Sequence, residues 1–143
     1  MRTRKASARN GAVETRGGQM FTGTVWGEVL MPHDAGATLN RVTFAPGART
    51  CWHRHMGGQM LICQAGSGLV VTRSGQVTHL CDGVIVHACP EEEHWHGALP
   101  EAFMTHLSCT LTGETQWLEP VGEDEYLSAV EKARADQVSV EKG

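Results

Sequence analysis

The stretch at residues 47–66 constrains this chain more than any other, because it carries two closely spaced histidines and a glutamine. Successive side chains of a β-strand point to opposite faces, so His53 and His55 share a face if the segment is extended. A Gly-rich turn signal at residues 56–58 separates them from Gln59, which begins an apolar run. We expect two antiparallel strands that bring the amide of Gln59 near both imidazoles, which is most of a metal site.

The bulk properties are those of one globular domain. A chain of 143 residues can bury one substantial core, and 41% hydrophobic and 20% charged residues are ordinary values. The net charge of -4 gives no reason to expect binding to nucleic acid or to an anionic membrane. No apolar run approaches the ~18 residues that a membrane-spanning helix needs. We therefore expect neither a nucleic-acid nor a membrane partner.

The cysteines indicate a reducing compartment. There are five, which is an odd number, and no Cys-x-x-Cys pair occurs among them. The basic N-terminus lacks the apolar segment of a secretory signal. We expect a cytoplasmic protein whose free thiols pack as small buried hydrophobic groups.

Short apolar segments separated by glycine and proline turns predict a mostly β protein, and their regular spacing is typical of a barrel or sandwich. Residues 1–18 hold few large apolar side chains, so we expect a flexible arm there. The predicted strands after this arm are 20–31, 38–45, 50–55, 59–64, 69–73, 77–80, 84–88, 94–98, 102–111 and 116–119.

The C-terminal region has a different period. Four apolar residues between 126 and 133 form one stripe along a helix. Acidic residues at the start of this segment and basic residues towards its end suit the helix dipole. The sequence therefore predicts a helix at residues 123–135 and a tail at 136–143, with residues 19–135 in one domain.

A second group of histidines lies on later predicted strands. His94 and His96 again stand two residues apart, and His106 follows among apolar and hydroxyl-bearing residues. One pair of exposed histidines on a strand is common, but two such pairs, each close to glycine and tryptophan, favour a metal site. These five histidines can line one cavity, whereas His33 and His79 lie beside turns and are expected to face solvent.

The chain resembles the cupin family at both histidine segments. The spacing of the first cupin motif is present, with glutamine where glutamate is usual, in Gly47, His53, His55, Gln59 and Gly66.

The second cupin motif is recognisable by its spacing but altered in its turn. Gly83 stands eleven residues before His94, as that motif requires. Cys89 stands where proline is usual, Glu91 where glycine is common, and Ala98 where asparagine is usual. These departures bear on the geometry of the turn more than on the histidine.

The cupin resemblance implies an all-β double-stranded β-helix barrel of the jelly-roll type with a short C-terminal helix. It also implies one divalent metal, for which Mn, Fe, Co, Ni and Zn all suit nitrogen and oxygen donors. Four neutral ligands leave the ion its double positive charge, which favours Lewis-acid chemistry over oxygen activation. The implied ligands are His53, His55, Gln59 and His94.

Within the cupins, the runs at 44–50, 52–55 and 94–98 resemble the bacterial manganese-dependent hydroxynitrile lyases, which cleave cyanohydrins to an aldehyde and hydrogen cyanide. This resemblance implies manganese as the metal and His106 as the base that takes the hydroxyl proton. It also implies that His96 is a donor in the pocket. The implied substrate wall consists of Asn40, Val42 and Thr110.

Three classes of function stay open on the sequence alone. They are a hydroxynitrile lyase, another cupin enzyme such as an isomerase or dioxygenase, and a metal- or ligand-binding barrel without catalysis. The enzyme classes imply a small-molecule substrate. Outward apolar positions such as Met60, Ile62 and Trp95, and the dimers and tetramers common among similar cupins, predict a homo-oligomer.

Overall fold

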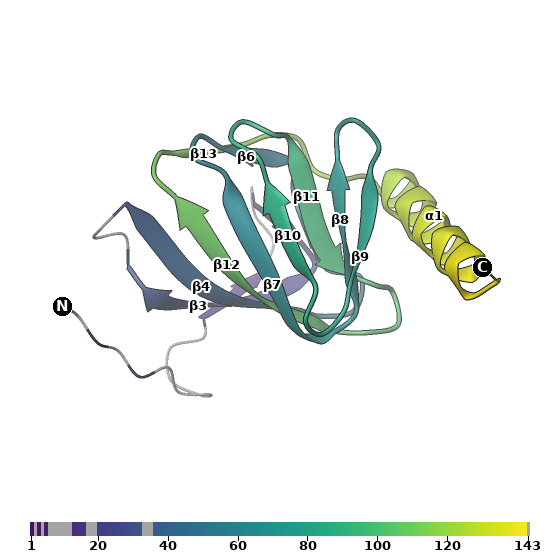
Figure 1. The fold of residues 1–143 in the computed structure, drawn as a ribbon, viewed down its shortest axis with the longest axis horizontal. Helices are drawn as coiled ribbons and strands as arrows, with labels where there is room; N and C mark the ends of the chain where they lie inside the picture. The colour runs from purple at the N-terminus through teal and green to yellow at the C-terminus, as the bar shows by residue number, and fades with distance from the viewer. Residues whose placement is uncertain (2, 4, 6–12, 17–19, 33–35, 143) are drawn as a thin grey trace.

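The chain folds into two facing antiparallel sheets with one helix outside them, as Figure 1 shows. This confirms the predicted all-β class with a C-terminal helix. The computed structural model describes residues 1, 3, 5, 13–16, 20–32 and 36–142. The elements are β1 (Val13–Arg16), β2 (Phe21–Thr22), β3 (Thr24–Met31), β4 (Ala37–Phe44), β5 (Arg49–Thr50), β6 (His53–His55), β7 (Gln59–Gly66), β8 (Gly68–Thr72), β9 (Val77–Leu80), β10 (Ile85–Ala88), β11 (His94–Ala98), β12 (Met104–Leu111), β13 (Thr115–Trp117) and α1 (Glu123–Lys142).

The first sheet forms one wall of the barrel, with its strands in the order β1-β3-β4-β12-β7-β10. Side chains alternate between the two faces, so every second residue of the central strands β4 and β12 points inward. On β4 these residues include Asn40, Val42 and Phe44, and all three line an internal cavity. The polar inward residues of these strands therefore face the cavity.

The second sheet is built around β11. This strand pairs with β5, β6 and β8, and the sheet order is β13-β6-β11-β5-β2, with β8 also pairing β9. The pairing of β6 with β11 places His53 opposite His94. The strand order thus joins two segments that are far apart in the sequence.

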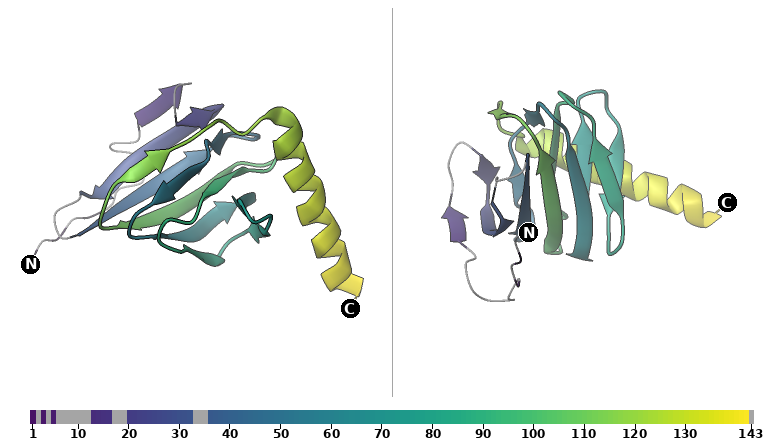
Figure 2. Two further views of the ribbon diagram at one scale, coloured as in Figure 1. Left: turned by 90° about the horizontal axis from the view of Figure 1, so that it is seen from above. Right: turned by 60° about the vertical axis from the view of Figure 1, so that its left-hand side comes forward.

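The hydrophobic core has two parts. One fills the barrel interior and contains Phe44, Leu61 and Met104, all fully buried. The other lies between the second sheet and α1, where the rings of Trp95 and Tyr126 have centroids 6.0 Å apart. Burying large aromatic side chains of this kind stabilises the contact by ~1.5–3 kcal/mol each. The helix is therefore part of the core, and Figure 2 shows it packed outside the strands.

Two predictions about this region are wrong in detail. Trp95 was expected to be exposed on the outer face of its strand, yet it is fully buried because α1 covers it. His79 was expected to face solvent, yet it is half-buried, and its ring nitrogens lie 2.6 Å from the Ser67 hydroxyl and 2.6 Å from the Gln137 amide nitrogen. His33 lies outside the described residues.

The terminal elements also differ from the expectation. Strand β1 lies within the predicted arm at 1–18 and pairs with β3, so these four residues are ordered in a sheet. The helix continues through most of the predicted tail and ends at Lys142. Within the part of the chain that the structure describes, no helix combines the length and apolar character needed to cross a membrane.

The predicted strand at 50–55 is interrupted. It forms β5 and β6, because Cys51 and Trp52 leave the ladder between them. The amide of Cys51 donates to the carbonyl of Met20 at 2.8 Å, and the amide of Trp52 donates to that of Glu119 at 2.9 Å. These bonds keep the interrupted backbone satisfied, so the break costs little.

Candidate metal centre

Strands β6 and β11 carry four buried histidines into one site. His53 and His94 lie opposite each other, with ring centroids 4.4 Å apart. His55 and His96 each lie two residues further along an antiparallel strand, so they flank this central pair on opposite sides. Their ring centroids lie 5.0 Å and 5.2 Å from that of His53. Strand register therefore assembles the four rings.

Backbone carbonyls set the tautomers of the central pair. Nδ1 of His53 lies 2.9 Å from the carbonyl oxygen of Cys51, and Nδ1 of His94 lies 2.9 Å from that of Glu92. A carbonyl oxygen can only accept, so each Nδ1 carries the proton and each Nε2 keeps its lone pair. Metal-binding histidines are oriented by the same kind of contact.

Gln59 and His55 flank the pair on one side. Oε1 of Gln59 lies 3.2 Å from Nε2 of His94, and its amide nitrogen donates to the hydroxyl of Thr110 at 3.0 Å. Because Nε2 of His94 keeps its lone pair, two acceptors face each other, which a cation between them would stabilise. His55 contacts the hydroxyl of Thr115 through Nδ1 at 2.9 Å, and its buried Nε2 forms no hydrogen bond with any residue that the structure describes.

His96 flanks the pair on the other side. Nitrogen atoms of His53, His94 and His96 lie within 4.8 Å of one another, a cluster of the kind that holds a metal ion. Nε2 of His96 is buried and has no hydrogen-bond partner among the described residues. The site thus offers two overlapping sets of donors, which share the central pair. One set adds the imidazole of His55 and the amide of Gln59, as predicted, and the other set adds His96.

Burial keeps these imidazoles neutral. It lowers the pKa of His53 and His96 well below the usual value, and the neighbouring imidazoles strengthen the shift. Burial also lowers the pKa of His55 to about 4 and lowers that of His94. The neutral imidazole is the form that binds a metal, so the residues present fit a divalent cation.

His106 faces the same cavity from β12 and is fully buried. Its Nε2 lies 3.0 Å from Nδ1 of His96, so one of these two nitrogens donates and the other accepts. Burial lowers the pKa of His106 to about 4. The ring is therefore neutral near pH 7 and able to accept a proton.

The cavity between the sheets has a volume of about 150 Å³. A cavity of this size admits one benzene-sized group. All three residues predicted to form the substrate wall line it, beside His106, and they are Asn40, Val42 and Thr110.

No family model matches the chain. A curated (R)-mandelonitrile lyase from Granulicella tundricola is 43% identical over 74% of this chain and 85% of that protein. The crystal structure of a cupin-like protein from Thermotoga maritima is 33% identical, with a TM-score of 0.81 over 87% of this chain and 97% of that one. The chain belongs to the cupin family. A cupin-2 domain from Rhodospirillum rubrum has the same fold at 14% identity, with a TM-score of 0.67 over 97% of this chain and 94% of that one.

The first motif of this cupin depends on two glycines in the turn between β6 and β7. A Cβ on Gly57 would lie 2.3 Å from the carbonyl oxygen of Thr112. Gly58 has a φ of 84°, and its Cβ would lie 2.9 Å from the carbonyl oxygen of Ala88. Only glycine fits both positions without a shift of the backbone.

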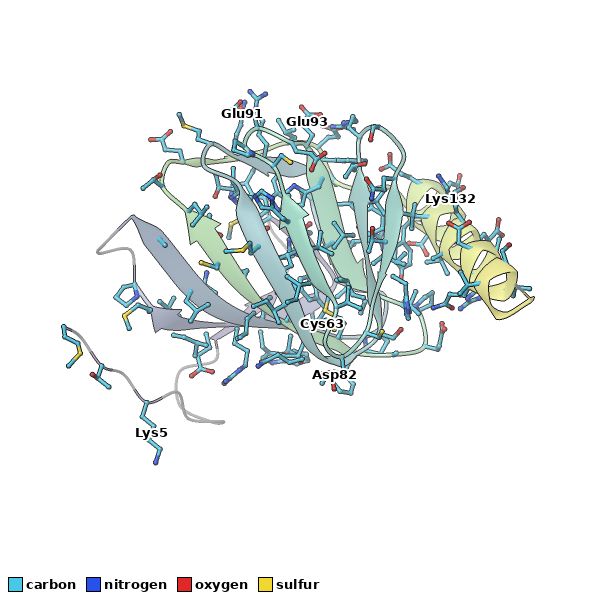
Figure 3. All side chains as sticks on the ribbon, in the orientation of Figure 1. Lys5, Cys63, Asp82, Glu91, Glu93 and Lys132 are labelled. Atoms are coloured by element: carbon cyan, nitrogen blue, oxygen red, sulfur yellow. The ribbon has the colours of Figure 1, made fainter. Side chains whose placement is uncertain are left out.

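The second motif of this cupin forms its turn despite the altered residues. Glu91 has a φ of 67°, the left-handed conformation that glycine adopts most easily. Its amide donates to the carbonyl of His55 at 2.8 Å, and its carboxylate lies 3.6 Å from the guanidinium of Arg54. Figure 3 shows Glu91 and Glu93 at one end of the barrel and Asp82 at the other.

Sequence reasoning missed several residues of the cavity wall. Ser108 lies opposite Asn40 and two positions from His106 on β12, so alternation along that strand was a usable signal. Phe21 and Trp117, whose ring centroids are 6.0 Å apart, line the cavity from two short strands. No local pattern connects these two rings, since only the sheet order brings them together.

Proposed function

We propose that this cupin is a metal-dependent lyase that cleaves α-hydroxynitriles to an aldehyde and hydrogen cyanide and catalyses the reverse addition. One observation carries the proposal: a buried neutral histidine, His106, shares a small cavity with a cluster of metal-type imidazoles. The curated (R)-mandelonitrile lyase at 43% identity supports the same reaction class.

The proposed metal ligands are His53, His55, Gln59 and His94. They are supported by the carbonyl-oriented tautomers of the central pair, by the unpartnered Nε2 of His55 and by the facing acceptors of Gln59 and His94. We propose manganese as the ion, following the resemblance to manganese-dependent lyases, although the same donors accept Fe, Co, Ni or Zn.

The ligand set decides the charge at the reacting oxygen. Gln59 is neutral, whereas a glutamate at this position would cancel one unit of positive charge. When bound, a divalent ion in this neutral set supplies Lewis-acid stabilisation to the oxygen that becomes negative during bond cleavage. The chain's own part is to keep the imidazoles neutral and oriented, through burial and through the carbonyls of Cys51 and Glu92.

His106 is the proposed base. It takes the proton of the substrate hydroxyl at a ring nitrogen, the O–H electron pair forms the carbonyl, and the C–CN bond breaks to release cyanide. The proton then passes to cyanide, so the products are aldehyde and hydrogen cyanide. A developing negative oxygen nearby raises the basicity of the ring, which offsets part of the effect of burial. His96, at 3.0 Å, orients the ring of His106.

The decisive experiment uses protein reconstituted with Mn²⁺ and (R)-mandelonitrile as substrate. Benzaldehyde release, followed by ultraviolet absorbance, is the expected result. His106→Ala should lower kcat by roughly 100-fold or more, the usual contribution of a positioned base. His87→Ala is the matched control, because this histidine is exposed on the outer side of β10.

Two outcomes would overturn the proposal. The first is the absence of benzaldehyde release by protein that has bound one equivalent of Mn²⁺. The second is full turnover by His106→Ala. Oxygen consumption by the Fe²⁺ form with a diol or diketone would instead support a dioxygenase, and a metal-bound protein inactive in every assay would support a binding barrel.

We also propose that the protein is a homo-oligomer. The outer face of β7 and β10 carries Met60, Ile62 and Ile85, and Ile85 is 65% exposed. Ile62 and Ile85 are direct cross-strand neighbours, so they form a continuous apolar surface. Light scattering should give a dimer or tetramer, and Ile85→Lys should shift it towards monomer. A monomeric wild-type protein would contradict this.

The cytoplasmic location stays a prediction. All five cysteines are free, and Cys51 and Cys63 are buried. Burial raises the pKa of both thiols, so both are weak nucleophiles at neutral pH. These properties suit a protein made in a reducing compartment.

A further inference from the structure

Two polar side chains on the cavity wall have no hydrogen-bond partner among the residues that the structure describes. Asn40 on β4 and Ser108 on β12 are direct cross-strand neighbours, and both line the cavity. Oδ1 of Asn40 is buried and makes no hydrogen bond within the described part of the chain, and Ser108 is only 4% exposed. Neither side chain forms a hydrogen bond with any other described residue, although Thr110 on the same wall accepts one from Gln59.

A buried polar group without a partner is costly. Such a group destabilises the fold, whereas an apolar residue of the same shape would not. Val42 and Phe44 on the same face of β4 show that this wall accommodates apolar side chains. The polar pair is therefore suited to a ligand that supplies the missing hydrogen bonds.

The surroundings of this pair favour a neutral ligand group. The described residues that line the cavity include no lysine, arginine, aspartate or glutamate. A charged group at Asn40 and Ser108 would lose its hydration with no charged side chain of the cavity wall to pair with it, which is unfavourable.

The polar pair offers both donors and acceptors. An amide has a donor end and an acceptor end, and a hydroxyl can do either. A nitrile nitrogen can only accept, so it would leave the acceptor of Asn40 unsatisfied. A hydroxyl group both donates and accepts, and it is the smallest neutral group that satisfies the pair.

The position of the pair relates it to the base. Ser108 lies two residues from His106 on the same face of β12, a distance of ~7 Å along the strand. That is about the span of a phenyl ring with one substituent. A ring whose reacting carbon lies at His106 therefore reaches Asn40 and Ser108 with its far edge.

We propose that Asn40 and Ser108 form a subsite for a second hydroxyl group of the substrate, so that the preferred substrates are ring-hydroxylated α-hydroxynitriles and the corresponding hydroxyaldehydes. The inference rests on the proposed lyase function for its reacting carbon. The hydroxyl of the subsite takes no part in bond cleavage and acts only in recognition.

The test compares mandelonitrile with its 2-, 3- and 4-hydroxy derivatives on the manganese-loaded protein. At least one hydroxy derivative should exceed mandelonitrile in kcat/KM by roughly 10- to 100-fold, the value of one or two satisfied buried hydrogen bonds. Asn40→Leu and Ser108→Ala should each reduce this ratio, and the double variant should abolish it. Gln64→Leu is the matched control, because it makes the same kind of change at an exposed position of β7.

Binding separates this inference from the lyase proposal. Calorimetry should show tighter binding of the matching hydroxybenzaldehyde than of benzaldehyde, and this difference should shrink in Asn40→Leu. A binding preference without any cyanohydrin cleavage would overturn the lyase function and leave the subsite intact. Cleavage with equal kcat/KM for all four nitriles, or a hydroxyl preference unchanged in both variants, would overturn the subsite.

Discussion

The two histidine segments reach one site from unequal sequences. Residues 47–66 keep the cupin spacing, whereas residues 83–98 have lost several of its usual turn residues. Both nevertheless deliver a histidine to the central pair, and the rings of His53 and His94 have centroids 4.4 Å apart. The difference teaches that strand register places the histidines, while turn residues affect mainly the strain of the connection.

Outward apolar residues of the two segments also differ. Helix α1 covers Trp95 of the second segment, whereas Met60 of the first segment remains exposed. The same sequence feature, an apolar residue on the outer face of a strand, therefore has two different outcomes. Whether such a residue is buried or exposed depends on what packs against that face of the sheet.

The largest expected effect concerns the central pair. Losing a residue that hydrogen-bonds to a metal ligand weakens metal binding by ~10- to 100-fold. His53→Ala and His94→Ala each remove a proposed ligand itself, so each should weaken Mn²⁺ binding by more than this. Isothermal calorimetry and elemental analysis would measure it, with His87→Ala as the control. Tight binding of one equivalent of Mn²⁺ by either variant would show that the two segments do not contribute equally to the site.

The next effect distinguishes the two sides of the pair. If Gln59 and His55 bind the metal, His55→Ala removes a ligand and should lower Mn²⁺ affinity by at least the ~10-fold that losing an outer partner costs, whereas His96→Ala should lower it less. Calorimetry on both variants would decide this. A larger loss of Mn²⁺ affinity in His96→Ala than in His55→Ala would assign the ion to the cluster of His53, His94 and His96.

A smaller effect tests how firmly α1 covers the second segment. Tyr126 donates to the carbonyl of Ala98 at 2.7 Å, and burial raises the pKa of Tyr126 to about 12. The unfolded chain loses this proton first, near pH ~10, so stability is complete below that pH and falls as pH rises towards 12. We expect a loss of ~2–3 kcal/mol across this range.

The measurement compares urea unfolding of wild type and Tyr126→Phe between about pH 8 and pH 12. The variant should lack this part of the pH dependence and should be less stable at pH ~8 by about 1 kcal/mol, because it lacks the hydrogen bond. Tyr126 is the one tyrosine of the chain, so tyrosinate absorbance reports it directly. Absorbance titrating near pH ~10 in the folded protein would contradict the burial argument.

The smallest effect tests the altered turn. Glu91→Gly should raise the free energy of unfolding by about 1 kcal/mol, because glycine adopts the observed φ of 67° without strain. The gain is partly offset by the extra freedom of glycine in the unfolded chain and by loss of the contact with Arg54. Unchanged or lower stability in urea unfolding would show that the strain relieved at residue 91 is no larger than these two losses.

Much of the fold was predictable because its signals are local. Alternation, turn residues and helix periodicity indicated the main strands and α1, and the cupin spacing indicated the central pair. The break at Cys51 and Trp52 and the extra strand β1 were missed, since both depend on hydrogen bonds to distant segments. The C-terminal turns of α1 were missed because they lack the apolar stripe of its first turns.

By itself, the sequence determined the fold class, the inward faces of the strands and the set of histidines that can reach a metal. Spacing along one strand decides which side chains share a face, and this needs no knowledge of the neighbours. The tertiary structure decided that His55 and His96 lie on opposite sides of the central pair, that α1 buries Trp95, and that Asn40 faces Ser108. These facts follow from strand order and packing, which join residues that no local pattern connects.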